Sequence, residues 1–339
     1  MDEGVFMNLK DNLIKKAKSN KKTIVLPEGE EERTIKAVSN ILSDDLANII
    51  LIGNEKKIKE KALQFNVNVY KATIIDPSTS DKRERYATKL YELRKHKGMT
   101  IEKAEQLIMD PIYFGLMIVK MDEADGLVSG AVHTTAELLR PALQIIKAAP
   151  SSSIVSSFFI MMVSNCNYGN NGLFIFADCG LVTRPSADEL ANIAIQTADT
   201  TKKLCEIDPK VALLSFSTKG SAKDESIDLI KNALNLVNAK RPDLNVDGEL
   251  QVDAALVPEV ASKKAPNSHV AGQANVLIFP DLNAGNIGYK LVERLANAQA
   301  IGPLCSGFAK PVNDLSRGCS IDDIFMTIIV TSVQAQMND

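Results

Sequence analysis

The sequence has no excess of basic residues and no long apolar run. Its 339 residues include 39 lysines and arginines against 42 aspartates and glutamates, with an isoelectric point near 5.8. Domains that bind nucleic acid neutralise its phosphates with a basic surface, so nucleic acid is not expected as a partner. The chain also lacks the roughly 18 uncharged apolar residues of a membrane helix and the pattern of a secretion signal. These absences predict a cytoplasmic protein without a membrane segment.

Metal-binding and redox patterns are missing as well. The five cysteines are an odd number, and no two of them form a C-x-x-C pair, which fits a reducing compartment. The three histidines show no metal-ligand spacing, so a histidine-centred mechanism is not expected. His133 lies in a glycine-containing turn, where a lone histidine is more often a hydrogen-bonded structural group than a catalytic one.

The sequence motifs of several large enzyme classes are absent. No G-x-G-x-x-G follows a predicted strand, and neither G-x-x-x-x-G-K-[ST], H-E-x-x-H nor G-x-S-x-G occurs. The sequence therefore lacks the main motif of four enzyme classes: dinucleotide-binding dehydrogenases, P-loop kinases, zinc proteases and serine hydrolases.

The apolar residues that are present predict an α/β protein of two domains. Length alone suggests about two domains, because one hydrophobic core rarely serves more than roughly 250 to 300 residues. Short β-branched runs alternate with helical patterns, as in a parallel sheet. A Pro-Ser-Ser-Ser sequence at 150–153 marks a crossing between domains. We expect residues 1–150 plus 308–339 to form one domain, residues 151–307 to form the other, and a cleft to lie between them.

Several predicted strands end in polar or glycine-containing turns. Ligands of open α/β sheets collect at the carboxyl ends of strands. The turn after residues 127–129 contains Ser129, Gly130, Thr134 and Thr135, and a helix follows it. A strand, a glycine turn and a helix N-terminus together suit a small anion. For any single one of these segments a tight turn without a ligand is the preferred explanation, and it is their number that indicates a site.

The most informative segment is 310–323, with the sequence KPVNDLSRGCSIDD. Ser320 can cap a helix whose first turn contains Asp322 and Asp323, which would explain both acids structurally. Ser316 and Arg317 precede that cap, so an arginine fork, a hydroxyl and backbone N–H groups could converge on one anion. From the residues alone, a structural and a catalytic interpretation remain open.

Several longer segments, in one order along the chain, resemble the phosphate acetyltransferase family from near Thr23 to the C-terminus. They are Tyr91-Glu-Leu-Arg-Lys, Asp125-Gly-Leu-Val-Ser-Gly-Ala-Val-His-Thr-Thr, Leu139-Arg-Pro, Asp247-Gly-Glu-Leu-Gln-Val-Asp-Ala-Ala, Phe279-Pro-Asp-Leu-Asn-Ala-Gly-Asn and Pro311-Val-Asn-Asp-Leu-Ser-Arg-Gly. The resemblance implies a fold like that of isocitrate and isopropylmalate dehydrogenases. It also implies reversible acetyl transfer between coenzyme A and inorganic phosphate in a homodimer, without a metal or prosthetic group.

The resemblance also assigns roles to residues. It implies chemistry at Ser316, Arg317 and Asp323, with Arg317 also binding acetyl phosphate, and it implies coenzyme A binding at Arg94 and Arg140. For the phosphate we add the glycine turn, with Ser129, Thr134 and Thr135.

Three alternatives remain at this point. A phosphate butyryltransferase would share fold and reaction and would differ in room for the acyl chain. A decarboxylating hydroxyacid dehydrogenase would share the fold, but its lysine, tyrosine and clustered metal-binding aspartates are not evident. A catalytically silent regulatory domain of this fold is disfavoured, because Ser316, Arg317 and Asp323 are all present.

Overall fold

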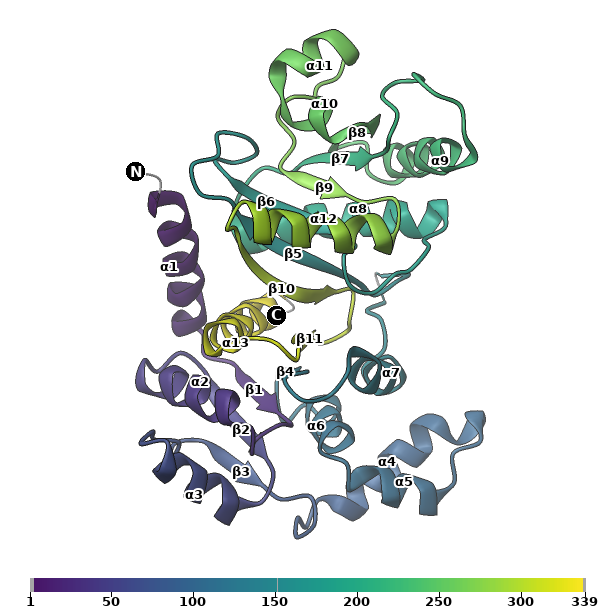
Figure 1. Ribbon diagram of the computed structural model, residues 1–339. Coiled ribbons are helices and arrows are strands. Elements are labelled where there is room, and N and C mark those ends of the chain that lie inside the picture. The colour runs from purple at the N-terminus through teal and green to yellow at the C-terminus, as the bar shows by residue number, and fades with distance from the viewer. Residues whose placement is uncertain (1–2, 151, 338–339) are drawn as a thin grey trace. The chain divides into compact units, whose positions relative to one another are not determined.

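The computed structural model describes residues 3–150 and 152–337, which form two compact α/β units. One unit, here called the terminal unit, comprises Asn12–Ala149 and the segment from Phe308 onward. The other, the middle unit, comprises Pro150–Gly307 together with the start of the chain as far as Asp11. Helix α1 (Glu3–Ser19) precedes the first strand. Figure 1 shows the elements of both units, which confirm the α/β class predicted from the sequence.

The terminal unit contains a sheet of five parallel strands in the order β11-β4-β1-β2-β3. The strands are β1 (Thr23–Leu26), β2 (Asn48–Ile52), β3 (Thr73–Ile75), β4 (Gly126–Ser129) and β11 (Val312–Asp314). The helices are α2 (Glu32–Ser43), α3 (Glu55–Gln64), α4 (Arg83–Arg94), α5 (Ile101–Ile108), α6 (Pro111–Lys120), α7 (Thr135–Ile145) and α13 (Ile321–Gln336), with a 3₁₀ turn η1 (Lys95–Lys97) after α4. The last strand in the sequence therefore lies beside the fourth, because β11 pairs with β4.

Helices α13 and α6 cover opposite faces of this sheet. A Cβ added to Gly126 would meet the Thr331 side chain of α13, whereas a Cβ added to Gly115 of α6 would meet the side chain of Leu127. Gly126 and Leu127 are consecutive in β4, and successive residues of a strand face opposite sides. The C-terminal helix also contacts α2 and β1, so it packs within the terminal unit.

The register places three polar segments at the carboxyl end of this sheet. Asp314 ends β11 beside Ser129, which ends β4, and β1 is followed closely by Glu28. Parallel strands bring their carboxyl ends to one edge of a sheet. The loop after β11, the glycine turn after β4 and the segment after β1 are therefore neighbours.

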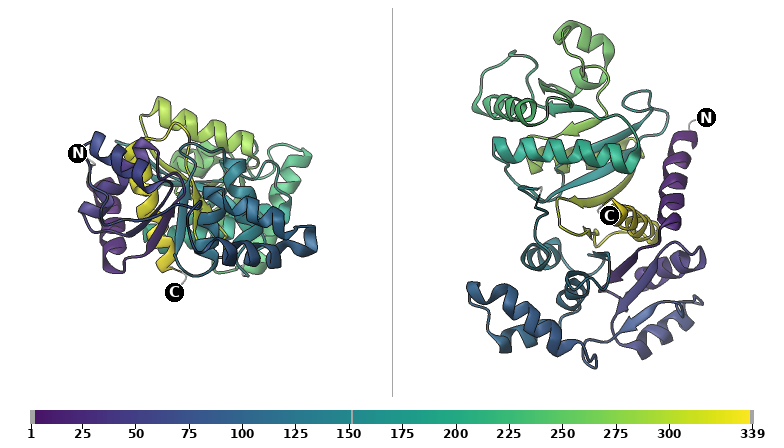
Figure 2. Two further views of the ribbon diagram at one scale, coloured as in Figure 1. Left: turned by 90° about the horizontal axis from the view of Figure 1, so that it is seen from below. Right: turned by 180° about the vertical axis from the view of Figure 1, so that it is seen from behind.

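The middle unit contains a mixed sheet of six strands in the order β10-β5-β6-β9-β7-β8. The elements are β5 (Ser156–Met162), β6 (Leu173–Ala177), α8 (Ala187–Thr200), a π turn η2 (Thr201–Cys205), β7 (Lys210–Leu214), α9 (Glu225–Lys240), β8 (Asn245–Leu250), α10 (Val252–Leu256), α11 (Pro258–Lys264), β9 (Val276–Ile278), α12 (Leu282–Leu295) and β10 (Gln299–Ser306). Strand β5 is antiparallel to both its neighbours, and the remaining pairs are parallel. Views from opposite sides show α12 on one face of this sheet and α8 on the other (Figures 1 and 2).

No helix in the part of the chain that the structure describes is long and apolar enough to cross a membrane.

Candidate active site

The loop between β11 and α13 presents Ser316 and Arg317 at the surface. Both residues are exposed, and the Gly318 N–H donates to Ser316 Oγ at 3.2 Å, which folds the loop back on itself. Leu315 before the pair and Cys319 after it are buried and anchor the loop on both sides. The loop thus holds a hydroxyl and a guanidinium at the surface on a short, fixed backbone.

Helix α13 begins with the cap that the sequence predicted. Ser320 Oγ accepts from the Asp323 N–H at 3.1 Å, and Asp323 Oδ2 accepts from the Ser320 N–H at 2.8 Å and from its hydroxyl at 2.9 Å. This reciprocal capping box satisfies the N–H groups of Ser320 and Asp323, which are two of the donors at the helix start. Asp323 therefore has a structural role, whatever else it does, while Asp322 is exposed.

The glycine turn after β4 already encloses an anion, and that anion belongs to the protein. Glu28 Oε2 accepts from the N–H groups of Gly130 and Ala131 at 3.0 and 2.8 Å. Its Oε1 accepts from those of Val132 and His133 at 2.9 Å each. Burial alone would raise the pKa of Glu28, but these backbone hydrogen bonds and one with the His133 ring outweigh it and lower the pKa. The turn is thus built around a buried carboxylate.

His133 has the structural role that the sequence favoured. Its Nδ1 lies 2.8 Å from Glu28 Oε1, so the ring closes the set of contacts around that carboxylate.

The three residues expected to bind phosphate in this turn have other surroundings. Thr134 Oγ1 donates to Glu137 Oε2 at 2.9 Å within the capping box of α7, and Thr135 Oγ1 donates to Asp314 Oδ2 at 2.5 Å. Ser129 Oγ is buried and has no hydrogen-bond partner among the described residues. The phosphate-binding role of these side chains stays a prediction, and Thr134 and Thr135 would have to exchange internal hydrogen bonds to fulfil it.

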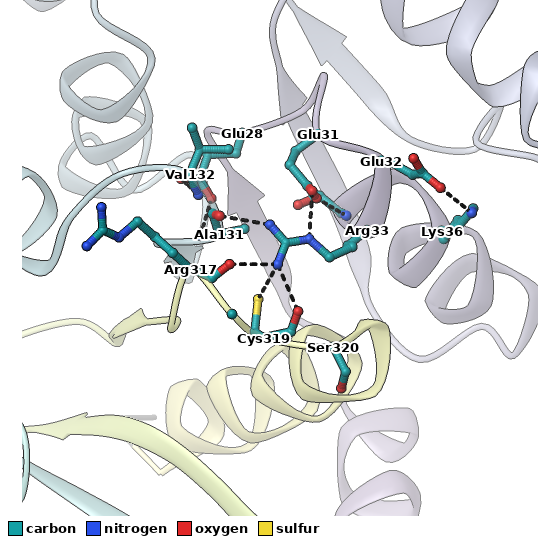
Figure 3. A network of polar contacts seen from close by, with 12 residues as sticks. Glu28, Glu31, Glu32, Arg33, Lys36, Ala131, Val132, Arg317, Cys319 and Ser320 are labelled. Carbon is teal, nitrogen blue, oxygen red and sulfur yellow. Dashed lines mark hydrogen bonds and ion pairs between the residues drawn. The ribbon is translucent and has the colours of Figure 1, made fainter. Parts of the chain in front are cut away.

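Arg33 joins the glycine turn to the Ser316 loop, and this role was not predicted from the sequence. Its guanidinium contacts backbone carbonyls of both segments, as Figure 3 shows. Glu28 was missed as well, although both residues lie in LPEGEEER, one of the polar segments that follow a predicted strand. The sequence does show an acidic residue directly after a buried strand. The segment contains four glutamates, however, and nothing in the sequence indicates which of them enters the glycine turn.

Arg94 and Arg140 lie on either side of Tyr113. One hollow of about 240 Å³ is lined by Arg140, His133, Glu137 and Tyr113 among others. A second of about 240 Å³ is lined by Arg94 and also includes Tyr113. Burial raises the pKa of Tyr113 and the charge of Asp110 adds to this, while the positive charges of Arg140 and Arg94 act in the opposite direction. The structure thus brings the two arginines to adjoining hollows that share one tyrosine.

The second hollow is strongly basic. Lys97 and Lys103 line it together with Arg94, and Gln144 contributes an amide. Three cationic side chains around a small hollow favour an anionic ligand with more than one charge, such as a phosphate monoester.

Arg317 lies close enough to the first hollow to influence a residue that lines it. The pKa of Glu137 is lowered mainly by hydrogen bonds from Thr134, and the electrostatic influence of nearby Arg317 adds to this lowering. Arg317 and Arg140 therefore both lie near Glu137 in the terminal unit. Within the described residues, no group of three His, Cys, Asp or Glu side chains is placed to hold a metal ion.

Comparison with known proteins identifies the family of this chain. The family model described as phosphate acetyl/butaryl transferase matches residues 8–332. A phosphate acetyltransferase of Clostridium acetobutylicum is 58% identical over 330 residues, which are 97% of this chain and 99% of that protein. A phosphate acetyltransferase of Thermoanaerobacterium thermosaccharolyticum is also 58% identical, over 97% of this chain and all of that protein.

Solved structures show the same fold. The crystal structure of a phosphotransacetylase from Streptococcus pyogenes matches with a TM-score of 0.92 and 44% identity, covering 98% of this chain and 99% of that one. A Salmonella typhimurium structure named for 4-hydroxythreonine-4-phosphate dehydrogenase matches with a TM-score of 0.51 at 11% identity, over 93% of this chain and all of that one. The second match concerns the fold alone and agrees with the dehydrogenase-like fold expected from the sequence. With a family model that spans nearly its whole length, this chain belongs to the phosphate acetyl/butaryl transferase family.

Proposed function

We propose that this chain transfers an acetyl group reversibly between coenzyme A and inorganic phosphate, with Ser316, Arg317 and Asp323 as the catalytic residues. The observation that carries the assignment is the loop at the carboxyl end of β11. It exposes a hydroxyl and a guanidinium directly before a helix whose first turn contains a carboxylate. Anions are stabilised at such a helix start by free N–H groups and by the helix dipole.

The guanidinium of Arg317 would bind the phosphoryl group of acetyl phosphate. Arginine presents a planar fork of donors that fits two phosphoryl oxygens at once. It would hold those oxygens while the coenzyme A thiolate attacks the acetyl carbonyl carbon, so that the S–C bond forms, the C–O bond breaks and phosphate departs with the bonding electrons.

Asp323 would accept the thiol proton. A thiol has a pKa near 8.5 and an ordinary aspartate one near 3.9, so complete proton transfer between them would be uphill by roughly 6 kcal/mol. Transfer must therefore be partial in the transition state, with the Ser316 hydroxyl and backbone N–H groups stabilising the emerging thiolate. Since Asp323 Oδ2 accepts two hydrogen bonds from Ser320, we assign proton acceptance to Oδ1.

Coenzyme A would bind along Arg140, Tyr113 and Arg94. Its pyrophosphate and ribose phosphate are separate anionic groups, and the two hollows on either side of Tyr113 offer separate cationic positions. Coenzyme A and acetyl-CoA act here as substrates, and no permanently bound cofactor enters the proposed reaction.

A homodimer would bury an apolar stripe on α12. Ile287, Leu291 and Leu295 are 58%, 52% and 79% exposed and follow one another at intervals of four residues, so they lie on one face of the helix. Exposed apolar stripes of this kind favour contact with another protein surface. Light scattering after size exclusion tests the dimer, and an Ile287→Glu and Leu291→Glu double variant should be monomeric.

The predicted domains, residues 1–150 plus 308–339 and residues 151–307, would be folding domains. They differ from the two units described above in the residues as far as Asp11, which belong there to the middle unit. The packing of α13 on α2, β1 and β4 supports assigning the C-terminal helix to the first domain. Native-state hydrogen exchange should show the protection of β11 and α13 changing together with that of β1 and β4 as denaturant is added. A cytoplasmic location is consistent with five cysteines that are thiols rather than disulfides.

Thioester formation from coenzyme A and acetyl phosphate tests the reaction itself. Purified protein should generate the thioester absorbance, and the reverse reaction should release thiol from acetyl-CoA only when phosphate is present. Arg317→Ala should lose most of this activity. The family name also includes butyryl transfer, so a comparison of acetyl phosphate with butyryl phosphate decides the chain length, and faster turnover of the butyryl substrate would overturn the acetyl assignment.

A further inference from the structure

Arg33 uses its guanidinium to join three segments that lie far apart in the sequence. Nη1 donates to the carbonyl oxygens of Arg317 and Cys319 at 2.9 and 2.8 Å. Nη2 donates to the carbonyl oxygen of Ala131 at 2.9 Å, and Nε donates to Glu31 Oε1 at 2.7 Å. One side chain near the start of α2 therefore holds both the glycine turn and the loop that contains Arg317 (Figure 3).

The contact is to the backbone of Arg317 and leaves its side chain available. In Figure 3 the Arg317 guanidinium points away from Arg33, while its carbonyl oxygen faces it. A rigid guanidinium fork can satisfy several carbonyl oxygens at fixed angles, which a single ammonium group cannot do. Arg33 thus fixes the direction in which the Arg317 side chain leaves the loop.

Glu28 orders the glycine turn that Arg33 contacts. Its side chain is 3% exposed, and it accepts hydrogen bonds from four consecutive N–H groups of residues 130–133. Four N–H groups turned toward one carboxylate determine where the carbonyl groups of that turn point, and the Ala131 carbonyl is the one that Arg33 contacts. The same turn leads into α7, which contains Arg140.

We infer that Arg33 is a positioning residue for acetyl transfer, because it locks the Arg317 loop to the Glu28-filled turn and so aims the Arg317 guanidinium at the phosphoryl group. The inference rests on the proposed role of Arg317. A displacement of about 1 Å at a reacting group can lower a rate by roughly 10²-fold. Loss of Arg33 should therefore reduce kcat/KM for acetyl phosphate by about 10- to 100-fold, with the KM for coenzyme A changed less than about threefold.

The test compares Arg33→Ala, Arg33→Lys and the control Lys36→Gln in the full-length protein. Lys36 lies on the same helix, pairs with Glu32 and is not part of the bridge to the Arg317 loop. Kinetics with both substrates and melting temperatures are measured for each variant. Arg33→Ala should lose kcat/KM for acetyl phosphate, and guanidinium ion at tens of millimolar should restore part of it, while Lys36→Gln should behave as the wild type without response to guanidinium. A role in stability alone would lower the melting temperature without such rescue.

The outcomes separate this inference from the proposed function. If Arg317→Ala is inactive and Arg33→Ala keeps kcat/KM for acetyl phosphate within twofold of wild type, Arg33 does not position Arg317 and the proposed function stands. If Arg317→Ala keeps full activity, the proposed function itself fails. Should Arg33→Ala not fold, Arg33→Lys decides: a selective loss for acetyl phosphate supports the inference, and wild-type kinetics overturn it.

Discussion

Thr135 Oγ1 donates a 2.5 Å hydrogen bond to Asp314 Oδ2, which joins the first residue of α7 to the last residue of β11. Asp314 is only 2% exposed, and its Oδ1 has no hydrogen-bond partner among the described residues. Burial raises the pKa of Asp314 to about 6, and the negative charge of Glu28 adds to the rise although the Thr135 hydrogen bond opposes it. A carboxyl group that resists ionisation therefore lies two residues before the proposed catalytic serine.

Replacing Asp314 by Asn should stabilise the protein at alkaline pH. A carboxyl group whose pKa is about 6 when folded and about 3.9 when unfolded contributes stability below pH 4 that is lost as pH rises to 6. The loss corresponds to at most about 3 kcal/mol, and an amide does not incur it. Unfolding by urea at pH 4 and pH 8 should show Asp314→Asn gaining relative to wild type only at pH 8. An equal difference at both values would mean that Asp314 is ionised without penalty. Glu28 has a lowered pKa, so its contribution to the free energy of unfolding is lost as pH falls. This effect is the same in wild type and in Asp314→Asn, and it does not change the difference between them.

Replacing Arg94 or Arg140 by Ala should weaken coenzyme A binding selectively. A hydrogen bond to a charged group contributes about 1.5 to 3 kcal/mol, so the KM for coenzyme A should rise roughly 10- to 100-fold. The KM for acetyl phosphate should change much less. Steady-state kinetics with each substrate varied in turn make the measurement.

Lys89→Ala is the control for this prediction, since Lys89 lies on α4 with Arg94 and pairs with Glu92. If the KM for coenzyme A is unchanged in both arginine variants, the prediction is wrong and the two arginines are surface residues without a role in coenzyme A binding.

Replacing Thr134 by Val tests the expected phosphate site in the glycine turn. The hydroxyl and the N–H groups at the start of α7 suit a small anion, so the KM for inorganic phosphate should rise in Thr134→Val and stay near wild type in Thr134→Ser. Loss of the N-cap should also cost about 0.5 to 2 kcal/mol of stability. A lower melting temperature with an unchanged KM for phosphate would restrict Thr134 to helix capping.

The sequence predicted the strands that are apolar throughout. The runs TIVL and LFIFA, which are made of β-branched and apolar residues, form β1 and β6. Ser186 caps α8, which is continued by the π turn η2. Continuous apolar runs and Ser/Thr caps are local signals, so single-sequence reasoning can find such elements.

Strands without a local signal were missed. Strand β8 contains the polar residues Asp247 and Glu249, both buried, and β10 is interrupted by Gly302 and Pro303. Strand β11 has only three residues. Each of these strands forms because it pairs with neighbouring strands and its side chains find partners elsewhere in the fold. Hydrophobic periodicity in the sequence does not reveal such contacts.

The candidate site was predicted in part for the same reason. The cap at Ser320 follows from neighbouring residues and is confirmed. The contacts of Arg33 with Arg317 and Cys319 span 284 and 286 residues, so they depend on the tertiary fold and leave no trace in local sequence. The cleft expected between the two domains and the catalytic roles of Ser316, Arg317 and Asp323 stay predictions.

The most direct measurement of the central claim is kcat and melting temperature for Asp323→Asn and Asp322→Asn on matched preparations. Asn can keep the size of Asp323 and an acceptor for the Ser320 N–H, but it removes the charge and the proton acceptor. A general base contributes about 10² to 10⁴ in rate, so Asp323→Asn should lose that much kcat with KM values nearly unchanged. Asp322→Asn should keep wild-type turnover, because adjacent helical residues point about 100° apart. Full turnover in Asp323→Asn with only a lower melting temperature, or loss of activity in Asp322→Asn instead, would contradict the account.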